Sequence, residues 1–254
     1  MSSAFRKPEI LALARRDGRV TVDDLAARFG VTAQTVRRDL AALCDSGQLG
    51  RVHGGAVVPA ATANIAYSAR QALNRGAKGA IAAAVAGDIC GGATVFLNIG
   101  TSTEAVAAAL LDHRDMLVVT NNLNVANILR GNDGCAVIVT GGSLRPSDGG
   151  LVGPLAMKTV GEFKFDIAVI GCSALDADGD LLDYDLDEIG VSQCVLRQAR
   201  QRFVVADATK LDRAAPARIA SLSEVDAIYT DAPPPPALAR LCAGWSTRVV
   251  VAPA

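Results

Sequence analysis

From residue 94 onward, short apolar runs alternate with helical patterns, and this alternation limits the fold more than any other feature of the chain. The strand candidates are 94–99, 117–120, 136–140, 166–171, 202–206, 227–230 and 247–252, and helical stretches lie between most of them, at 102–111, 123–130, 151–163, 186–199 and 236–243. Strands this apolar are typical of burial on both faces. The alternation therefore predicts an α/β fold, in which helices cover a mainly parallel sheet.

A different pattern occupies the first 57 residues. Apolar side chains recur there at i, i+4 and i+7, at Val36, Leu40 and Leu43, and Thr32 stands where it can cap the resulting helix. Immediately before it, residues 21–30 contain a cap, a short helical stretch and a glycine stop. A helix, a tight turn and a second helix are the layout of a helix-turn-helix.

The face opposite that apolar stripe is polar and basic. Gln34 and Arg38 lie on it, with Thr35 and Arg37 on its flanks. Such groups can bond base edges and phosphates in a major groove, although a solvated basic face would have the same composition. The glycine-rich residues 47–56 that follow predict a small β-wing. We therefore expect DNA contacts from Thr32, Gln34, Thr35, Arg37, Arg38, Arg51 and His53.

Charge and composition divide the chain into two modules. Residues 1–57 contain nine Lys or Arg and six Asp or Glu, whereas residues 58–254 contain sixteen and twenty, so a basic module is joined to a mildly acidic one. Residues 59–64 break the apolar pattern between them. We predict a winged helix-turn-helix DNA-binding domain at 1–57, a linker at 58–74 and an effector domain at 75–254.

Several other classes of protein are not indicated. No apolar run reaches the ~18 residues of a membrane span, and the N-terminus lacks a signal-peptide layout. The six cysteines are scattered without a C-x-x-C pair, which favours reduced thiols in a cytoplasmic protein. The glycines at 87–92 precede a strand, so they do not predict a dinucleotide site, and the acidic run at 176–180 lacks EF-hand spacing. We expect no cofactor and no metal.

Polar residues follow several of the predicted strands, where ligands bind in open α/β sheets. The first group is Asn98 with residues 100–103, in which Gly100 permits a tight turn and three hydroxyls stand at the start of a helix. Backbone N–H groups and hydroxyls at a helix N-terminus can bind an anion, most naturally a phosphate. Simple capping of the helix by one of these hydroxyls is an equally good interpretation of this stretch alone.

Comparable groups follow the other strands, and together they predict a pocket for a small polyol phosphate. Lys210 offers an ammonium, and amides and carboxylates offer partners for hydroxyls. The expected effector-binding residues are Asn98, Gly100, Thr101, Ser102, Thr103, Thr120, Asn121, Asn122, Gly141, Gly142, Asp148, Gly149, Asp183 and Lys210.

A family resemblance extends over nearly the whole chain. Residues 32–40, followed at the expected spacing by 51–56, resemble the winged helix-turn-helix of DeoR-type regulators of sugar metabolism. Five further stretches resemble the effector domain of that family, namely residues 98–110, 120–129, 140–153, 166–173 and 206–210. That domain is similar in fold to ribose-5-phosphate isomerase.

The resemblance narrows at residues 99–107, 119–127 and 225–235 to members that control glycerol 3-phosphate metabolism. It implies a repressor induced by sn-glycerol 3-phosphate. Leu211-Asp212 replaces the usual Phe-Gly, and residues 189–192 lack the usual basic residues. Both departures are expected near the pocket, so a different sugar phosphate stays open as the effector.

Two further functions compete with this one. A sugar-phosphate isomerase with a DNA-binding head could use Asp178, Asp183, Asp185, Glu188 and Lys210, but they form no compact acid–base motif, and neither His53 nor His113 resembles a general base. We assign no catalytic residue. An activator is the other alternative, because the sign of regulation depends on where the operator lies. As partners we expect a palindromic operator and self-association to a dimer or tetramer.

Overall fold

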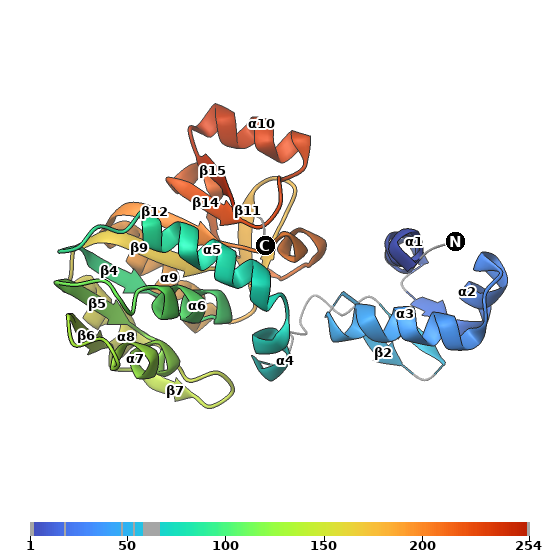
Figure 1. Ribbon diagram of the computed structural model, residues 1–254, viewed down its shortest axis with the longest axis horizontal. Coiled ribbons are helices and arrows are strands. Elements are labelled where there is room, and N and C mark those ends of the chain that lie inside the picture. Colours follow the sequence, from blue (N-terminus) through green and yellow to red (C-terminus); the bar gives the residue numbers. More distant parts are fainter. Residues whose placement is uncertain (1–2, 18, 47, 53, 58–66, 253–254) are drawn as a thin grey trace. The chain divides into compact units, whose positions relative to one another are not determined.

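The computed structural model describes residues 3–17, 19–46, 48–52, 54–57 and 67–252. The chain divides into two compact units, Met1–Ile65 and Ala66–Ala254 (Figure 1). Part of the stretch assigned to the linker, residues 67–72, folds as helix α4 (Tyr67–Ala72) of the second unit. Within the described residues, no helix is both long enough and apolar enough to cross a membrane.

The first unit is a winged helix-turn-helix. Its elements are α1 (Ser3–Asp17), β1 (Arg19–Thr21), α2 (Val22–Phe29), α3 (Ala33–Asp45), β2 (Gly50–Val52) and β3 (Gly55–Val57). The predicted helix, turn and helix are confirmed. β1 was not predicted; it joins the wing in an antiparallel sheet of order β1-β3-β2.

Local chemistry sets the limits of the two central helices. The Thr21 hydroxyl accepts a hydrogen bond from Asp24 N, and the Thr32 hydroxyl accepts one from Thr35 N, so each threonine caps the helix that follows it. Gly30 ends α2 in the left-handed region at φ 62°, where glycine is favoured. Apolar residues of all three helices then pack into one core, which includes Ile10, Leu25, Val36, Leu40 and Leu43.

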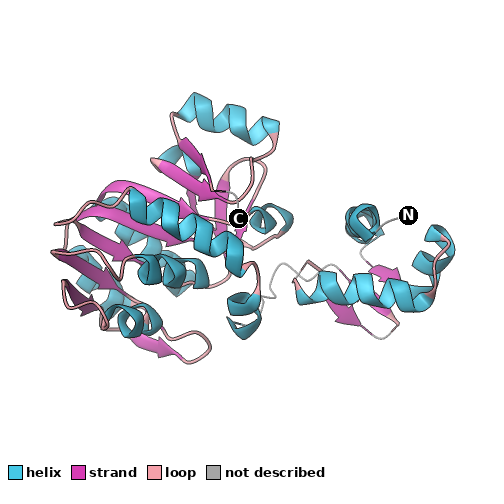
Figure 2. Cartoon of the chain, viewed as in Figure 1, coloured by secondary structure: helices cyan, strands magenta, loops and turns pink. Residues whose placement is uncertain are grey.

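The second unit is built on a seven-stranded parallel sheet (Figure 2). Its strands are β4 (Thr94–Leu97), β5 (Met116–Thr120), β6 (Cys135–Val139), β9 (Phe165–Gly171), β12 (Ala199–Val205), β14 (Ala227–Thr230) and β15 (Arg248–Val251). Their order in the sheet is β15-β14-β12-β9-β4-β5-β6. All seven correspond to the predicted strands, and the predicted α/β class is confirmed.

Helices cover both faces of this sheet (Figure 1). One apolar cluster joins the sheet to α5 (Arg75–Gly87), α6 (Thr101–Ala109) and α7 (Leu123–Leu129). The other joins it to α8 (Pro154–Gly161), α9 (Leu186–Gln198) and α10 (Pro236–Trp245). Along β4, Phe96 faces the second cluster while Val95 and Leu97 face the first, as the period-2 alternation of a strand requires.

Shorter strands depart from the expected pattern. The helix predicted at 151–163 begins only at Pro154, because the residues before it form β8 (Gly150–Val152), which pairs with β7 (Ser143–Arg145). A second small sheet contains β10 (Ala174–Leu175), β11 (Asp180–Asp183) and β13 (Ala217–Ser221). Strands of two or three residues, such as β7, β8 and β10, carry too little periodicity to be recognised from the sequence, and β13 pairs with β11 from a distant part of the chain.

The order of the large sheet creates a switch point. From β4 the chain proceeds through β5 and β6 toward one edge, and then returns to place β9 on the other side of β4. The connections that leave the carboxyl ends of β4 and β9 therefore run in opposite directions. In open α/β sheets the crevice at such a point is where ligands bind.

Candidate functional site

A cavity of about 490 Å³, including the space at its open mouth, lies at this switch point. The loops after β4, β9 and β12 form its floor, and α4, β11 and α9 contribute side chains. Its lining residues are Arg70, Leu73, Lys78, Ile99, Gly100, Thr101, Ser102, Thr103, Gly171, Cys172, Ser173, Asp183, Glu188, Asp207, Lys210 and Arg213. Of the expected effector-binding residues, the cavity brings together Gly100, Thr101, Ser102, Thr103, Asp183 and Lys210.

The N-terminus of α6 opens onto this cavity without a side-chain cap. Gly100 is the N-cap residue, at φ 147°, and no side chain caps the helix there. The Thr103 hydroxyl instead donates to the carbonyl oxygens of Asn98 and Gly100, at 2.7 Å each. The first-turn N–H groups of α6 are therefore available to an anion, and capping alone does not account for this stretch.

Four cationic side chains line the same cavity, namely Arg70, Lys78, Lys210 and Arg213. Lys210 is buried, and among the described residues it makes no ion pair or hydrogen bond through its ammonium group. Burial lowers the pKa of Lys210, and the neighbouring Arg213 lowers it further. Among the described residues no carboxylate lies within ion-pair distance of this buried ammonium, and the nearby Asp207 offsets its charge only in part, so the arrangement favours the binding of an anion.

Lys78 connects the cavity to α4. Its ammonium donates to the carbonyl oxygens of Arg70 and Leu73, the latter at 2.7 Å. Burial lowers the pKa of Lys78 to about 8, against the opposing effect of Asp207. The positive charge of Lys78 therefore depends on pH, and an anion bound nearby would favour its charged form.

Two carboxyl groups, those of Asp183 and Glu188, form an acidic wall of the same cavity. Asp183 accepts hydrogen bonds from the Ser173 hydroxyl at 3.0 Å and from Tyr184 N at 2.7 Å. Glu188 accepts one from Arg145 at 2.5 Å. Burial raises the pKa of Glu188 and Asp183 adds to this effect, whereas Arg145 opposes it. These carboxyl groups can accept hydrogen bonds from hydroxyls, so the cavity suits a small molecule with an anionic group and hydroxyl groups.

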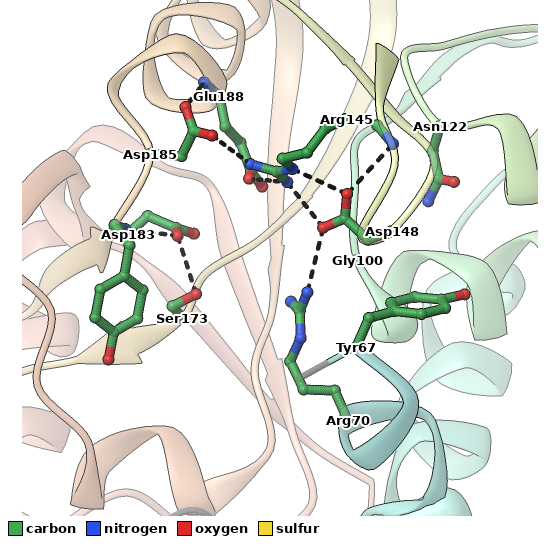
Figure 3. A network of polar contacts seen from close by, with 12 residues as sticks. Tyr67, Arg70, Gly100, Asn122, Arg145, Asp148, Ser173, Asp183, Asp185 and Glu188 are labelled. Carbon is green, nitrogen blue, oxygen red and sulfur yellow. Dashed lines mark hydrogen bonds and ion pairs between the residues drawn. The ribbon is translucent and has the colours of Figure 1, made fainter. Parts of the chain in front are cut away.

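A network of charged groups borders the acidic wall (Figure 3). Arg145, from β7, bonds Asp148 at 2.9 Å, Asp185 at 2.7 Å and Glu188 at 2.5 Å. Arg70, from α4, reaches the same Asp148 from the other side at 3.2 Å. The β7–β8 hairpin, α9 and α4 thus meet in one set of ion pairs.

The other expected effector-binding residues do not line the cavity. β5 and β6 lie on the side of β4 away from β9, so their carboxyl ends are displaced from the switch point. Thr120 donates to Leu97 O at 2.7 Å, and Asn121 donates to Leu151 O at 3.1 Å. Both side chains hold neighbouring backbone segments together. Asn98 has a similar part, since its side-chain oxygen accepts a hydrogen bond from Gly171 N.

Asn122 and the other expected effector-binding residues outside the cavity also have structural roles. Asn122 caps α7 and donates to Glu104 at 3.2 Å. Gly141 and Gly142 lie close to α8 and β8, where a Cβ at Gly142 would be 2.7 Å from a backbone oxygen. Asp148 binds Arg145 and Arg70, and Gly149 turns the hairpin at φ 74°.

Of the four cationic residues of the cavity, the sequence predicted only Lys210 and missed Arg70, Lys78 and Arg213. Arg70 was placed in the linker, and Lys78 looked like part of an ordinary helix. Arg213 lies three residues beyond the predicted Lys210, so a search for further cations near that residue could have found it. Cys172, Ser173 and Asp207 follow predicted strands and were accessible to the same strand-end argument.

A separate candidate surface lies on the first unit. Gln34, Arg37 and Arg38 of α3 are all exposed, while the buried ion pair between Arg6 and Asp39, at 2.8 Å, joins α1 to α3. The hydroxyls of Thr32 and Thr35, also expected to contact DNA, lie 3.0 Å apart at the start of α3.

The wing borders this helix. The Arg51 side chain is 68% exposed and 3.7 Å from Asp45, which leaves it largely free to reach a phosphate. His53 lies outside the described residues. The exposed groups of α3 and the wing can together contact a groove and its flanking backbone.

A winged helix-turn-helix unit followed by an α/β unit with a cation-lined cavity is the organisation of ligand-sensing DNA-binding regulators. Two family models match this division: a DeoR-like helix-turn-helix domain at residues 6–62 and a DeoR C-terminal sensor domain at residues 73–232. The chain belongs to the DeoR family of transcriptional regulators. This membership, together with relatives that are named as repressors, rejects the isomerase alternative.

Curated relatives match along almost their full length. The chain is 40% identical to the glycerol-3-phosphate regulon repressor of Escherichia coli K12, over 92% of this chain and 93% of that protein. It is also 40% identical to the repressor of the same name from Haemophilus influenzae, over 91% and 90%. The HTH-type transcriptional repressor CsqR of Escherichia coli K12 is 39% identical, over 92% and 89%.

Among solved structures, ribose 5-phosphate isomerase from Plasmodium falciparum superposes with a TM-score of 0.39 at 13% identity, over 53% of this chain and 52% of that chain. A likeness at this level adds nothing to the functional assignment.

Proposed function

We propose that this protein is a repressor of glycerol and glycerol 3-phosphate metabolism that leaves its operator when sn-glycerol 3-phosphate occupies the cavity. It acts in the cytoplasm as a dimer or tetramer on a palindromic operator, which its α3 helices read in the major groove. The observation that carries the proposal is the buried Lys210, which has no ion pair within the described part of the chain and lies in the same cavity as Arg213 and the uncapped N-terminus of α6. A phosphate supplies the counter-charge that these groups lack.

Glycerol 3-phosphate fits both walls of the cavity. Its phosphate matches the cationic side, and its hydroxyls match Asp183 and Glu188 on the acidic side. Two relatives of 40% identity are named for the glycerol-3-phosphate regulon, which supports the same effector. A ~100-fold loss of operator affinity needs about 2.7 kcal/mol of coupling, within the usual range for allosteric ligands.

A different phosphorylated sugar is the second candidate effector. It is favoured by Leu211-Asp212, which stands where the family usually has Phe-Gly and directly follows Lys210. CsqR, almost as similar at 39% identity, carries no reference to glycerol in its name. Phosphate recognition is common to both candidates, so Lys210 serves either of them.

The test is a gel shift on operator DNA with a panel of phosphorylated polyols and sugars. We expect wild type to release DNA with millimolar sn-glycerol 3-phosphate, and Lys210→Ala to bind the operator normally but to resist release. Lys158→Ala is the matched control, because Lys158 is exposed on α8 and does not line the cavity. Release of wild type by another sugar phosphate alone would reject glycerol 3-phosphate, and normal release of Lys210→Ala would reject the cavity.

A further inference from the structure

Arg70 is the cationic residue of the cavity with the most unusual connections. It lies on α4, the first described element after the DNA-binding unit in the chain. Its Nη2 is paired with Asp148 at 3.2 Å, while its Nε is buried and has no hydrogen-bond partner among the described residues. A buried donor left unpaired costs free energy that an incoming acceptor can recover.

The helix that carries Arg70 is held mainly by polar contacts. No residue of α4 is buried. The Tyr67 hydroxyl donates to Glu104 at 2.9 Å, Lys78 donates to the carbonyl oxygen of Arg70, and Arg70 pairs with Asp148. Arg70 and Lys78 line the cavity, so two of these three contacts involve charged groups on which an anion in the cavity would act.

Asp148 does not depend on Arg70. It also receives two hydrogen bonds from Arg145, each 2.9 Å long, and one of its oxygens accepts Gly150 N at 3.3 Å. The Asp148 carboxylate therefore keeps its hydrogen bonds from Arg145 and Gly150 if Arg70 moves away from it. Arg70 in turn gains from a phosphate, because a guanidinium can bind one with two parallel hydrogen bonds that employ its unpaired Nε.

On the basis of the proposed function, we infer that Arg70 exchanges Asp148 for the phosphate of the effector, and that this exchange repositions α4 to couple the occupied cavity to the DNA-binding unit. Arg70 is thus both an effector-binding residue and a coupling residue. The ligand shifts the equilibrium because it binds the exchanged state better than the state with Arg70 on Asp148.

The decisive variant is Arg70→Gln in the full-length chain, which keeps a polar side chain but removes the charge. Two quantities are measured: the dissociation constant of sn-glycerol 3-phosphate by calorimetry, and operator affinity by gel shift with and without saturating sn-glycerol 3-phosphate. In wild type we expect saturation to weaken operator binding ~100-fold. In Arg70→Gln we expect weaker but measurable effector binding through the other three cations, and less than ~10-fold weakening of operator binding at saturation.

Arg240→Gln is the matched control, since Arg240 is an exposed arginine on α10 outside the cavity, and it should behave as wild type. Full release of Arg70→Gln from the operator at saturating effector overturns the coupling role. A complete loss of effector binding by Arg70→Gln also overturns it, because Arg70 would then be a binding residue only. Failure of wild type to bind the effector overturns the proposed function and this inference together. Binding by wild type with full release of Arg70→Gln overturns the inference alone.

Discussion

At the scale of single residues, the cavity is a collection of cations placed where water cannot fully hydrate them. Burial lowers the pKa of Lys78, Lys210 and Arg213 alike, which is the physical signature of charges that lack sufficient counter-charge. An anionic ligand relieves both the burial and the mutual repulsion of these side chains. Because these cations destabilise one another when no anion is bound, an anionic ligand that binds among them gains affinity.

A pH dependence of effector binding follows from Lys78. Its pKa of about 8 in the empty cavity means that it is mostly charged at neutral pH and mostly neutral one to two units higher. A bound phosphate raises that pKa again, so affinity is greatest below about pH 8 and declines above it. If the bound pKa returns near the ordinary value for lysine, the dissociation constant increases by up to ~10-fold per pH unit above that point.

Calorimetric titration with sn-glycerol 3-phosphate at intervals from about pH 7 to about pH 9 measures this slope. Lys78→Arg retains a charge across the whole interval, because arginine does not deprotonate there, and should give a flatter profile. Equal slopes for the two proteins would show that Lys78 does not hold the ligand's charge.

At the scale of elements, helix α3 and the wing offer different groups for the proposed contacts with DNA. α3 presents its exposed side chains at the N-terminal end, whereas its buried stripe of Val36, Leu40 and Leu43 fixes its rotation against the core. The wing is a short hairpin that places Arg51 beside the same groove-facing surface. The helix is suited to read bases and the wing is suited to contact phosphates.

Arg38→Ala and Arg51→Ala should therefore have different effects. Arg38→Ala is expected to cost about 1–3 kcal/mol of operator binding and much less on a scrambled duplex. Arg51→Ala should weaken binding to both duplexes equally and reduce the salt slope by about one. Gel shifts on the two duplexes at several salt concentrations distinguish these effects. An unchanged operator affinity removes Arg38 from the contacts, and an unchanged slope makes Arg51 structural.

At the scale of the whole molecule, sensing and DNA reading belong to separate compact units of one chain. A regulator of this type gains specificity when two-fold symmetry presents two recognition helices to two half-sites. In the proposed dimer or tetramer, release by the effector would act on both half-sites together, which would increase the effect of effector binding on operator occupancy.

Helical phasing tests this assembly. Sedimentation should give a dimer or tetramer, and the full palindrome should bind more tightly than a half-site. An insertion of about 5 base pairs between the half-sites places them on opposite faces of the duplex and should weaken binding, whereas about 10 base pairs should restore much of it. A monomer that binds half-sites and spaced palindromes equally would contradict the two-fold assembly.

Patterns that repeat within a few residues allowed the sequence to predict the helix-turn-helix and the seven strands of the large sheet. Thr32 caps α3 and Gly30 ends α2 through contacts within their own turns, so no distant residue is needed to predict either boundary. The strands of the sheet are recognisable because burial on both faces demands unbroken apolar runs.

The cavity was predictable only in part, because its residues come together through the order of strands in the sheet. Thr101 and Lys210 follow predicted strands, and the rule that ligands bind at carboxyl ends was enough to select them. That rule could not say that β9 pairs with β4, which brings the loop after β9 into the cavity and moves Thr120 and Asn121 away from it.

Arg70 shows what only the tertiary structure decided. Its partner Asp148 lies 78 residues further along the chain, and the other cavity cations come from α5 and from the loop after β12. A cation on a short polar helix has no periodic signal, and its charge acquires meaning only from the groups that surround it. Sequence periodicity records which side chains are buried, whereas the pairing of strands far apart in the chain determines which charges are buried together.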